Sequence, residues 1–232
     1  MKRAMKTIIA GIGFLGLLIL PTQAFAFIVI GGSGPWGSYT GSFDYQSTSA
    51  TAATLEIKLK NTSAAANGGY ITALAFNNPS NFITGVTKTT SPAAFDNLLG
   101  GTTFNNTISA SPYGSFDIGA SISNQFNGGE QPSQGIGVGV EETFLFTLSG
   151  NSLDTIDDAD FFNELSSGGS NGQINPAFLV RFRGFKNDAS DKVPGFPDIP
   201  TDPTDTTSLP EPATMVLLGS GLVGGILVRR KK

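Results

Sequence analysis

Apolar and polar residues alternate along part of the first half of the chain. Leu55, Ile57 and Leu59 are separated by charged residues, which places the three apolar side chains on one face of an extended strand. The triplet Asn67-Gly68-Gly69 follows and is typical of a turn. We expect this turn to return the chain through residues 70–76, whose nearly continuous apolar run is typical of a central strand buried on both faces.

The same two-residue period recurs downstream, where apolar residues again share one strand face. Further strands are predicted at residues 82–86, 116–120, 136–140, 143–148 and 178–185. Many short strands joined by Gly-rich turns indicate an all-β fold. We expect a two-sheet β-sandwich over residues 27–185, jelly-roll or immunoglobulin-like in topology. Phe is expected to dominate the core, because the chain has 18 Phe but only one Trp and four Tyr.

One short helix is predicted over residues 157–165. Thr155 and Asp158 have the spacing of a capping box, and acidic residues gather in the first turn. The same carboxylates suggest a calcium site as an alternative, since hard cations prefer several oxygen ligands, although the spacing does not match an EF-hand loop. The candidate calcium ligands are Asp154, Asp157, Asp158 and Asp160, with Glu164 nearby.

The N-terminus has the three parts of a secretory signal peptide. Basic residues precede an apolar run over residues 8–20, and the small residues Ala24 and Ala26 then fit the pockets of a signal peptidase. Residues 1–26 are therefore predicted to be removed. An uncleaved anchor helix is the alternative, but the apolar run is short for a membrane span.

The C-terminus combines a proline-rich triplet, an apolar stretch and a basic end. The apolar stretch, residues 213–228, covers about 24 Å as a helix, slightly less than the hydrocarbon thickness of about 30 Å, and basic side chains can snorkel to bridge the difference. The basic residues are expected to stay cytoplasmic, which places the preceding domain outside the inner membrane. The triplet is Pro210, Glu211 and Pro212, and the basic end is Arg229, Arg230, Lys231 and Lys232.

These three parts in this order resemble the PEP-CTERM sorting signal of exopolysaccharide-producing Gram-negative bacteria. The resemblance covers residues 210–232 and implies recognition by an exosortase, a membrane peptidase that cuts near the Pro-Glu-Pro triplet. It also implies an inner-membrane-anchored precursor and a final location at the cell surface or outside the cell. A plain single-span anchor with an incidental triplet is the alternative.

Residues 186–209 are rich in Pro, Asp and Thr, and we expect them to form an extended linker that holds the body away from the membrane. Residues 27–209 contain 7 basic and 17 acidic residues, a net charge of −10. Such a surface repels phosphate groups, so nucleic acid is not an expected partner.

The chain contains no Cys and no His. This composition excludes disulfides, thiolate nucleophiles, zinc sites built from His or Cys, and a Ser-His-Asp triad. A hydrolase would need a Ser-Lys nucleophile, or a pair of carboxylates within about 10 Å in a cleft, and no spacing identifies such a pair.

We therefore expect a non-enzymatic structural or adhesive protein of the cell surface or of an exopolysaccharide matrix, with no cofactor. The alternative is a glycan-binding module that stacks sugars on exposed aromatic side chains. Its candidate residues are Trp36, Tyr39, Tyr45 and Tyr113, which could instead pack in the core.

Overall fold

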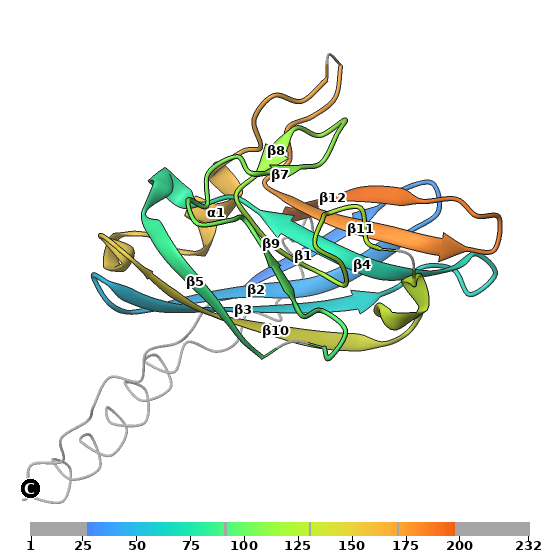
Figure 1. The fold of residues 1–232 in the computed structure, drawn as a ribbon, viewed down its shortest axis with the longest axis horizontal. Helices are drawn as coiled ribbons and strands as arrows, with labels where there is room; N and C mark the ends of the chain where they lie inside the picture. Colours follow the sequence, from blue (N-terminus) through green and yellow to red (C-terminus); the bar gives the residue numbers. More distant parts are fainter. Residues whose placement is uncertain (1–26, 91, 130, 171, 198–232) are drawn as a thin grey trace, which may run out of the picture. The chain divides into compact units, whose positions relative to one another are not determined.

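The computed structural model describes residues 27–90, 92–129, 131–170 and 172–197. The predicted signal peptide, the remainder of the linker and the sorting segment lie outside these residues. The described residues are mostly β-strands with one short α-helix, which confirms the all-β prediction (Figure 1).

Ten of the twelve strands in the described residues form one antiparallel sheet, in the order β5-β10-β3-β2-β1-β12-β11-β4-β9-β6. Its strands are β1 (Ile28–Ser33), β2 (Ser38–Ser49), β3 (Ala52–Asn61), β4 (Gly68–Phe76), β5 (Ile83–Thr90), β6 (Asn97–Leu99), β9 (Ile118–Ser121), β10 (Glu141–Gly150), β11 (Phe178–Phe185) and β12 (Asp191–Pro197). The strands β7 (Ile108–Ser109) and β8 (Ser115–Phe116) form a separate pair. Short 3-10 helices are η1 (Pro79–Asn81), η2 (Pro132–Gln134) and η3 (Leu153–Thr155).

Two groups of five strands meet in the middle of this order, where β1, the first strand along the chain, pairs with β12, the last. Ile30 on β1 is paired with Pro197 on β12, and Gly31 is paired with Phe196. We name the strands on either side of this contact the β2 half (β5, β10, β3, β2 and β1) and the β4 half (β12, β11, β4, β9 and β6). The two halves belong to one nearly closed sheet, so the expected division into two separate sheets is not confirmed.

The two halves meet in a core of Phe side chains. The ring of Phe76 on β4 lies 6.0 Å from that of Phe43 on β2 and 5.7 Å from that of Phe146 on β10, centroid to centroid. Both contacts have the edge-to-face geometry that aromatic pairs favour. The predicted Phe-rich core is therefore confirmed.

Local patterning predicted several strands well. Leu55, Ile57 and Leu59 are all buried on β3, and β11 has the predicted bounds. β4 is buried along nearly its whole length between β11 and β9, as expected for a central strand. The prediction of a strand at 136–140 is wrong: only Ile136 forms an isolated bridge, to Ile71.

Two predictions about connections are also wrong. β3 and β4 do not pair, because β3 lies between β2 and β10 in the other half, so the turn after β3 leads the chain across the core. The segment predicted as a linker from residue 186 contains β12, which pairs with β11 and β1, so residues 191–197 belong to the sheet. The predicted strand at 116–120 is divided between β8 and β9.

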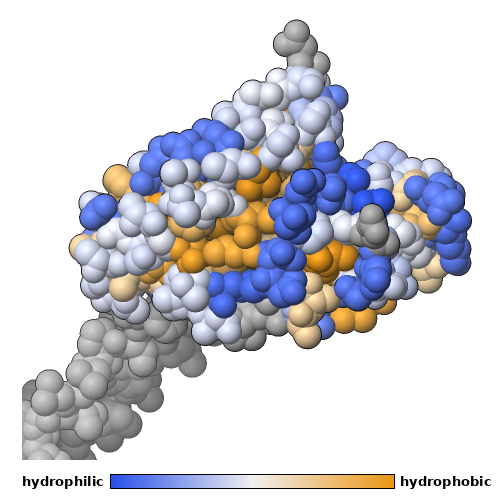
Figure 2. All heavy atoms as spheres, viewed as in Figure 1, coloured by the Kyte–Doolittle hydropathy of each residue, from blue (hydrophilic) through white to orange (hydrophobic). Residues whose placement is uncertain are grey.

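The outer face of the β4 half carries a second, smaller apolar cluster. Loops around β7 and β8, together with the segment that carries Phe126, cover Ala73 and Ala75 of β4 and Leu179 of β11. Figure 2 shows hydrophobic residues gathered at the centre of the face on which β4 and β9 lie in Figure 1. The centre of β4 and the start of β11 are therefore buried on both sides.

Candidate functional site

The residues assigned to processing lie outside the described part of the chain. They are Ala24 and Ala26, then Pro210, Glu211 and Pro212, and then Arg229, Arg230, Lys231 and Lys232. Their roles in processing stay predictions.

The acidic segment forms the start of helix α1 (Asp158–Asn163). Asp157 is its N-cap: one carboxylate oxygen accepts hydrogen bonds from the amides of Ala159 (2.9 Å) and Asp160 (3.3 Å). The carboxylate of Asp160 accepts a hydrogen bond of 2.9 Å from the amide of Asp157. The capping box is therefore present, but it joins Asp157 and Asp160, two residues later than the predicted pair Thr155 and Asp158. The helix is shorter than predicted.

Asp158 faces the sheet and connects the helix to β2. Its carboxylate accepts a hydrogen bond of 2.6 Å from the amide of Tyr45. Burial is the main cause that raises the pKa of Asp158 to about 6, and the nearby negative charges of Asp44 and Asp157 add to it, while the hydrogen bond from Tyr45 opposes the rise. Asp158 thus acts as a structural acceptor.

The described residues contain no group of three or more metal-binding side chains arranged to hold an ion. Asp157, Asp158 and Asp160 instead each accept hydrogen bonds from main-chain amides. The structure supports capping as the role of this segment and does not bring the candidate calcium ligands Asp154, Asp157, Asp158 and Asp160 together as a metal site.

The four candidate sugar-stacking residues do not form one exposed platform. Tyr39 and Tyr45 are buried, Tyr113 is half-buried, and Trp36 is 41% exposed. The ring of Tyr39 packs between those of Phe178 and Phe182, at 6.2 and 6.5 Å. The core alternative is therefore correct for both buried tyrosines, and burial raises the pKa of each.

A cavity of about 660 Å³ opens between the loop before β6 and the start of β10. Two carboxylate residues, Asp96 and Glu142, are among its lining residues, together with Ile122, Ile136 and Val140. Glu142 forms no ion pair with any of the described residues. Two carboxylates in the lining of one cavity are what a two-carboxylate mechanism requires, so Asp96 and Glu142 are candidates for it.

A second cavity, of about 650 Å³, lies on the outer face of the β4 half. Its apolar lining includes Leu99, Ile108 and Phe126 from the second cluster. Its polar lining consists of uncharged side chains: Thr107, Ser109, Asn124, Gln125 and Asn127. An apolar surface with amide and hydroxyl groups around it suits an uncharged polar ligand. Its lining residues come from the very short strands β6 and β7 and from loops, which are too short or too irregular to show a periodic pattern in the sequence.

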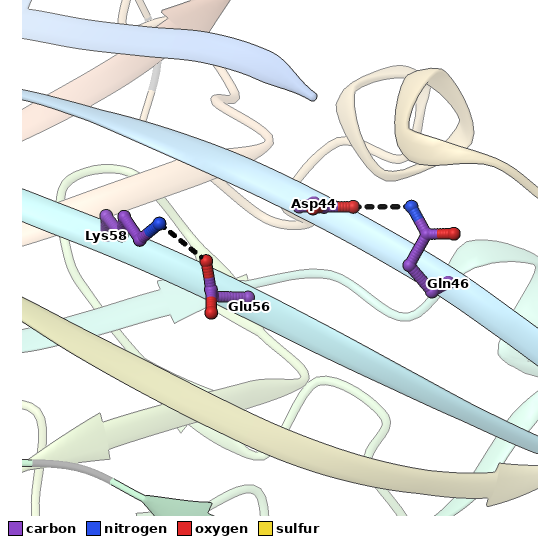
Figure 3. A network of polar contacts seen from close by, with 4 residues as sticks. All are labelled: Asp44, Gln46, Glu56 and Lys58. Atoms are coloured by element: carbon purple, nitrogen blue, oxygen red, sulfur yellow. Dashed lines mark hydrogen bonds and ion pairs between the residues drawn. The ribbon is translucent and has the colours of Figure 1, made fainter. Parts of the chain in front are cut away.

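The outer face of the β2 half is a solvated polar surface. Figure 3 shows the ion pair of 2.9 Å between Lys58 and Glu56 on β3 and the hydrogen bond of 2.6 Å from Gln46 to Asp44 on β2. These side chains are polar residues of the outward-facing positions between buried core residues. Pairs of this kind contribute little to stability and indicate no chemistry.

Among the described residues, no helix has the length and apolar character that a membrane span requires. A family model of the PEP-CTERM protein-sorting motif matches residues 208–232. No curated protein and no solved structure matches the chain. The motif marks the chain as an exported protein that is targeted to an exosortase, and it includes Pro210, Glu211 and Pro212.

Proposed function

We propose that this protein is a non-enzymatic structural or adhesive component of the cell surface or of an exopolysaccharide matrix. The observation that carries the proposal is the PEP-CTERM motif at residues 208–232, which supplies the route to the exosortase. Signal peptidase removes residues 1–26, and the C-terminal apolar helix then holds the precursor in the inner membrane. The exosortase cuts near Glu211 and delivers the β-rich body to its final location.

The composition of the chain supports a non-enzymatic role. It has no His and no Cys, the residues that most often serve as general base or nucleophile in hydrolases. The body has a continuous Phe-rich core and a net negative surface, which are properties of a stable and soluble spacer or scaffold.

Mass spectrometry of the protein recovered from its own host tests this route. We expect a mature form that begins at Phe27 and ends near Pro212. Glu211→Ala removes the acidic residue of the triplet and should leave the C-terminal segment attached. Asp205→Ala removes the same charge upstream of the motif and should be processed normally.

Two results would contradict the proposal. One is a mature protein that retains Lys232, which would remove the exosortase from the pathway. The other is a reporter fused before residue 210 that stays in the cytosol. The body must cross the inner membrane before the C-terminal apolar helix arrests translocation.

The second cavity favours one alternative, a glycan-binding module. Its uncharged rim and apolar lining match the hydroxyl groups and apolar ring faces of a neutral sugar. Titration calorimetry with neutral oligosaccharides tests it. Binding that Thr107→Ala and Asn124→Ala weaken, and that the distant Thr54→Ala does not, would favour the alternative; no heat with any neutral sugar would remove it.

A further inference from the structure

Three positively charged residues gather on the outer face of the β4 half. On β11, Phe182 points into the core, so its neighbours Arg181 and Arg183 lie on the opposite side of the strand. Lys192 on β12 is the residue directly paired with Arg181. Residues 27–209 contain only 7 basic residues against 17 acidic ones, so three of the seven stand together in an otherwise acidic body.

The pairing of Arg181 with Lys192 is unfavourable in the protein alone. Like charges directly opposite each other on neighbouring strands repel. Burial is the main cause that lowers the pKa of both groups, and a neighbouring cation adds to it in each case, Arg183 for Arg181 and Arg181 for Lys192. Asp191 offsets this effect only in part for Arg181, so a bound negative charge would relieve the remaining repulsion.

Both cations line the same small cavity. Its volume is about 260 Å³, and its other lining residues come from the loop between β7 and β8 and from the start of β12. Those residues are Ser111, Pro112, Tyr113, Ser190 and Asp191. A water molecule occupies about 30 Å³ in the liquid, so the cavity has room for one small group of several heavy atoms.

The hydrogen-bond donors of Arg181 are not used within the described residues. Its Nε atom is buried without a partner, and no described residue accepts a hydrogen bond from its guanidinium group. Lys192 donates one hydrogen bond from Nζ to the carbonyl oxygen of Ser111. The Nη donors of Arg181 and the other donors of Lys192 therefore remain for a ligand, whereas the buried Nε atom is not accessible to one.

The one carboxylate in the cavity is held by other groups. Asp191 accepts hydrogen bonds of 3.1 Å from the amides of Trp36 and Gly37 and one of 2.9 Å from the amide of Lys192. Among the described residues, Asp191 forms no ion pair with Arg181 or Lys192. The positive charge of the cavity is thus only partly balanced.

We propose that this cavity binds a single anionic group, a carboxylate, sulfate or phosphate, with Arg181 supplying a planar set of donors and Lys192 a second positive charge. Guanidinium groups bind planar and tetrahedral oxyanions through two parallel hydrogen bonds. The anion relieves the repulsion between the two cations. It is carried either by a free inorganic ion or by an acidic sugar unit of a larger glycan.

Titration calorimetry on the purified full chain in a non-ionic detergent tests the proposal. The probes are sulfate, phosphate and glucuronate at constant ionic strength, with glucose as the neutral control. We expect millimolar binding of the anions and none of glucose, and a loss of about tenfold or more in Arg181→Gln. Tighter binding of glucuronate than of sulfate identifies the acidic sugar as the source, and the reverse order identifies the free ion.

Lys60→Gln is the matched control, because Lys60 is an exposed cation on β3 in the β2 half. This variant should bind the anions as the unmodified protein does. Unchanged binding in Arg181→Gln, or an equal loss in Lys60→Gln, would overturn the proposal, since the effect would then reflect net charge alone.

Thermal unfolding gives a second test, because Arg181→Gln should affect the melting temperature differently without and with added anions. Without anions, Arg181→Gln should melt no lower than the unmodified protein, because the substitution removes a repulsion. Added sulfate at low millimolar concentration should raise the melting temperature of the unmodified protein and of Lys60→Gln but not of Arg181→Gln. An equal rise in all three would overturn the proposal, and Lys192→Gln serves as the test variant if Arg181→Gln does not fold.

Discussion

The carboxylate of Asp158 accepts a hydrogen bond of 2.6 Å from the main-chain amide of Tyr45, and the Tyr45 hydroxyl donates one of 2.6 Å to the carbonyl of Leu153. These two bonds tie β2 to both ends of the segment that leads from η3 into α1. The sequence of the acidic segment suggests a possible calcium site. In the structure, the segment is instead hydrogen-bonded to β2 and packs on the sheet.

The first prediction concerns pH. The pKa of Asp158 is raised to about 6 in the folded protein, above its usual value of 3.8, so the folded state binds this proton more tightly than the unfolded state does. The resulting stabilisation is complete below about pH 4 and is lost as the pH rises through 6. Asp158→Asn removes the titration and keeps an acceptor oxygen for Tyr45. The difference in the free energy of unfolding between the variant and the unmodified protein should therefore favour the variant by about 1 kcal/mol more at pH 7 than at pH 4. This value is reduced for solvent screening.

Urea unfolding at both pH values measures this difference. A difference in the free energy of unfolding that stays constant between pH 4 and pH 7 would show that Asp158 does not titrate in this range.

The second prediction concerns the Tyr45 hydroxyl. Tyr45→Phe leaves the buried carbonyl of Leu153 without this donor, and an unsatisfied buried acceptor costs about 1–3 kcal/mol. Tyr70→Phe is the control, because no described residue forms a hydrogen bond with the Tyr70 hydroxyl. Thermal unfolding should show a lower melting temperature for the first variant only; equal melting temperatures would remove the role assigned to the Leu153 bond.

The third prediction concerns the contact between the halves of the sheet. Phe43 is fully buried, and its ring lies 5.0 Å from that of Phe161 on α1 and 6.4 Å from that of Phe178 on β11. Phe43→Ala should lower the free energy of unfolding by about 3–5 kcal/mol. Phe196→Ala, on a side chain that is 52% exposed, should have a much smaller effect. Similar losses in denaturant unfolding would contradict this account of the core.

The fourth prediction concerns a close approach between strands. A Cβ atom added at Gly41 on β2 would lie 2.0 Å from the carbonyl oxygen of Lys58 on β3, whereas one added at Gly31 would lie 3.4 Å from the carbonyl oxygen of Tyr39. Gly41→Ala should therefore destabilise the protein, because the main chains must separate, and Gly31→Ala should be tolerated. Circular dichroism during heating compares the two, and a Gly41→Ala protein as stable as the Gly31→Ala protein would show that the strands move apart freely.

The fifth prediction concerns catalysis. Asp96 and Glu142 line one cavity, so they are the residues to examine for glycosidase activity. We expect the full chain to release no reducing sugar from polysaccharides of the organism that produces it. Activity that disappears in both Asp96→Asn and Glu142→Gln would contradict the non-enzymatic assignment.

Sequence periodicity located strands where burial is one-sided and regular. β3 and β11 alternate between core and outer positions, and the alternation is visible in their residues. β2 was missed although Tyr39, Gly41, Phe43 and Tyr45 also follow a period of two, because the polar residues between them dominate its composition. β12 was missed because Pro194 and Pro197 are typical of a linker, yet both lie within a paired strand.

Pairing partners could not be predicted from the same signals. A turn such as the one at Asn67 marks where the chain changes direction but does not specify the next partner: β4 pairs with β11 and β9, and its Phe76 faces Phe43 of β2 across the core. The cavity lined by Arg181 and Lys192 could not be predicted for the same reason. Arg181 and Lys192 are eleven positions apart in the chain, and only the antiparallel register of β11 and β12 brings them together.

The antiparallel register that places Ile30 opposite Pro197 puts the entry and exit of the body on neighbouring strands. A short peptide can therefore join the two, and new termini can be opened in the exposed turn at Ala50 between β2 and β3. The body is thus suited to circular permutation, which would keep every strand neighbour while moving the point of attachment from beside Phe43 on β2 to the turn that ends this strand.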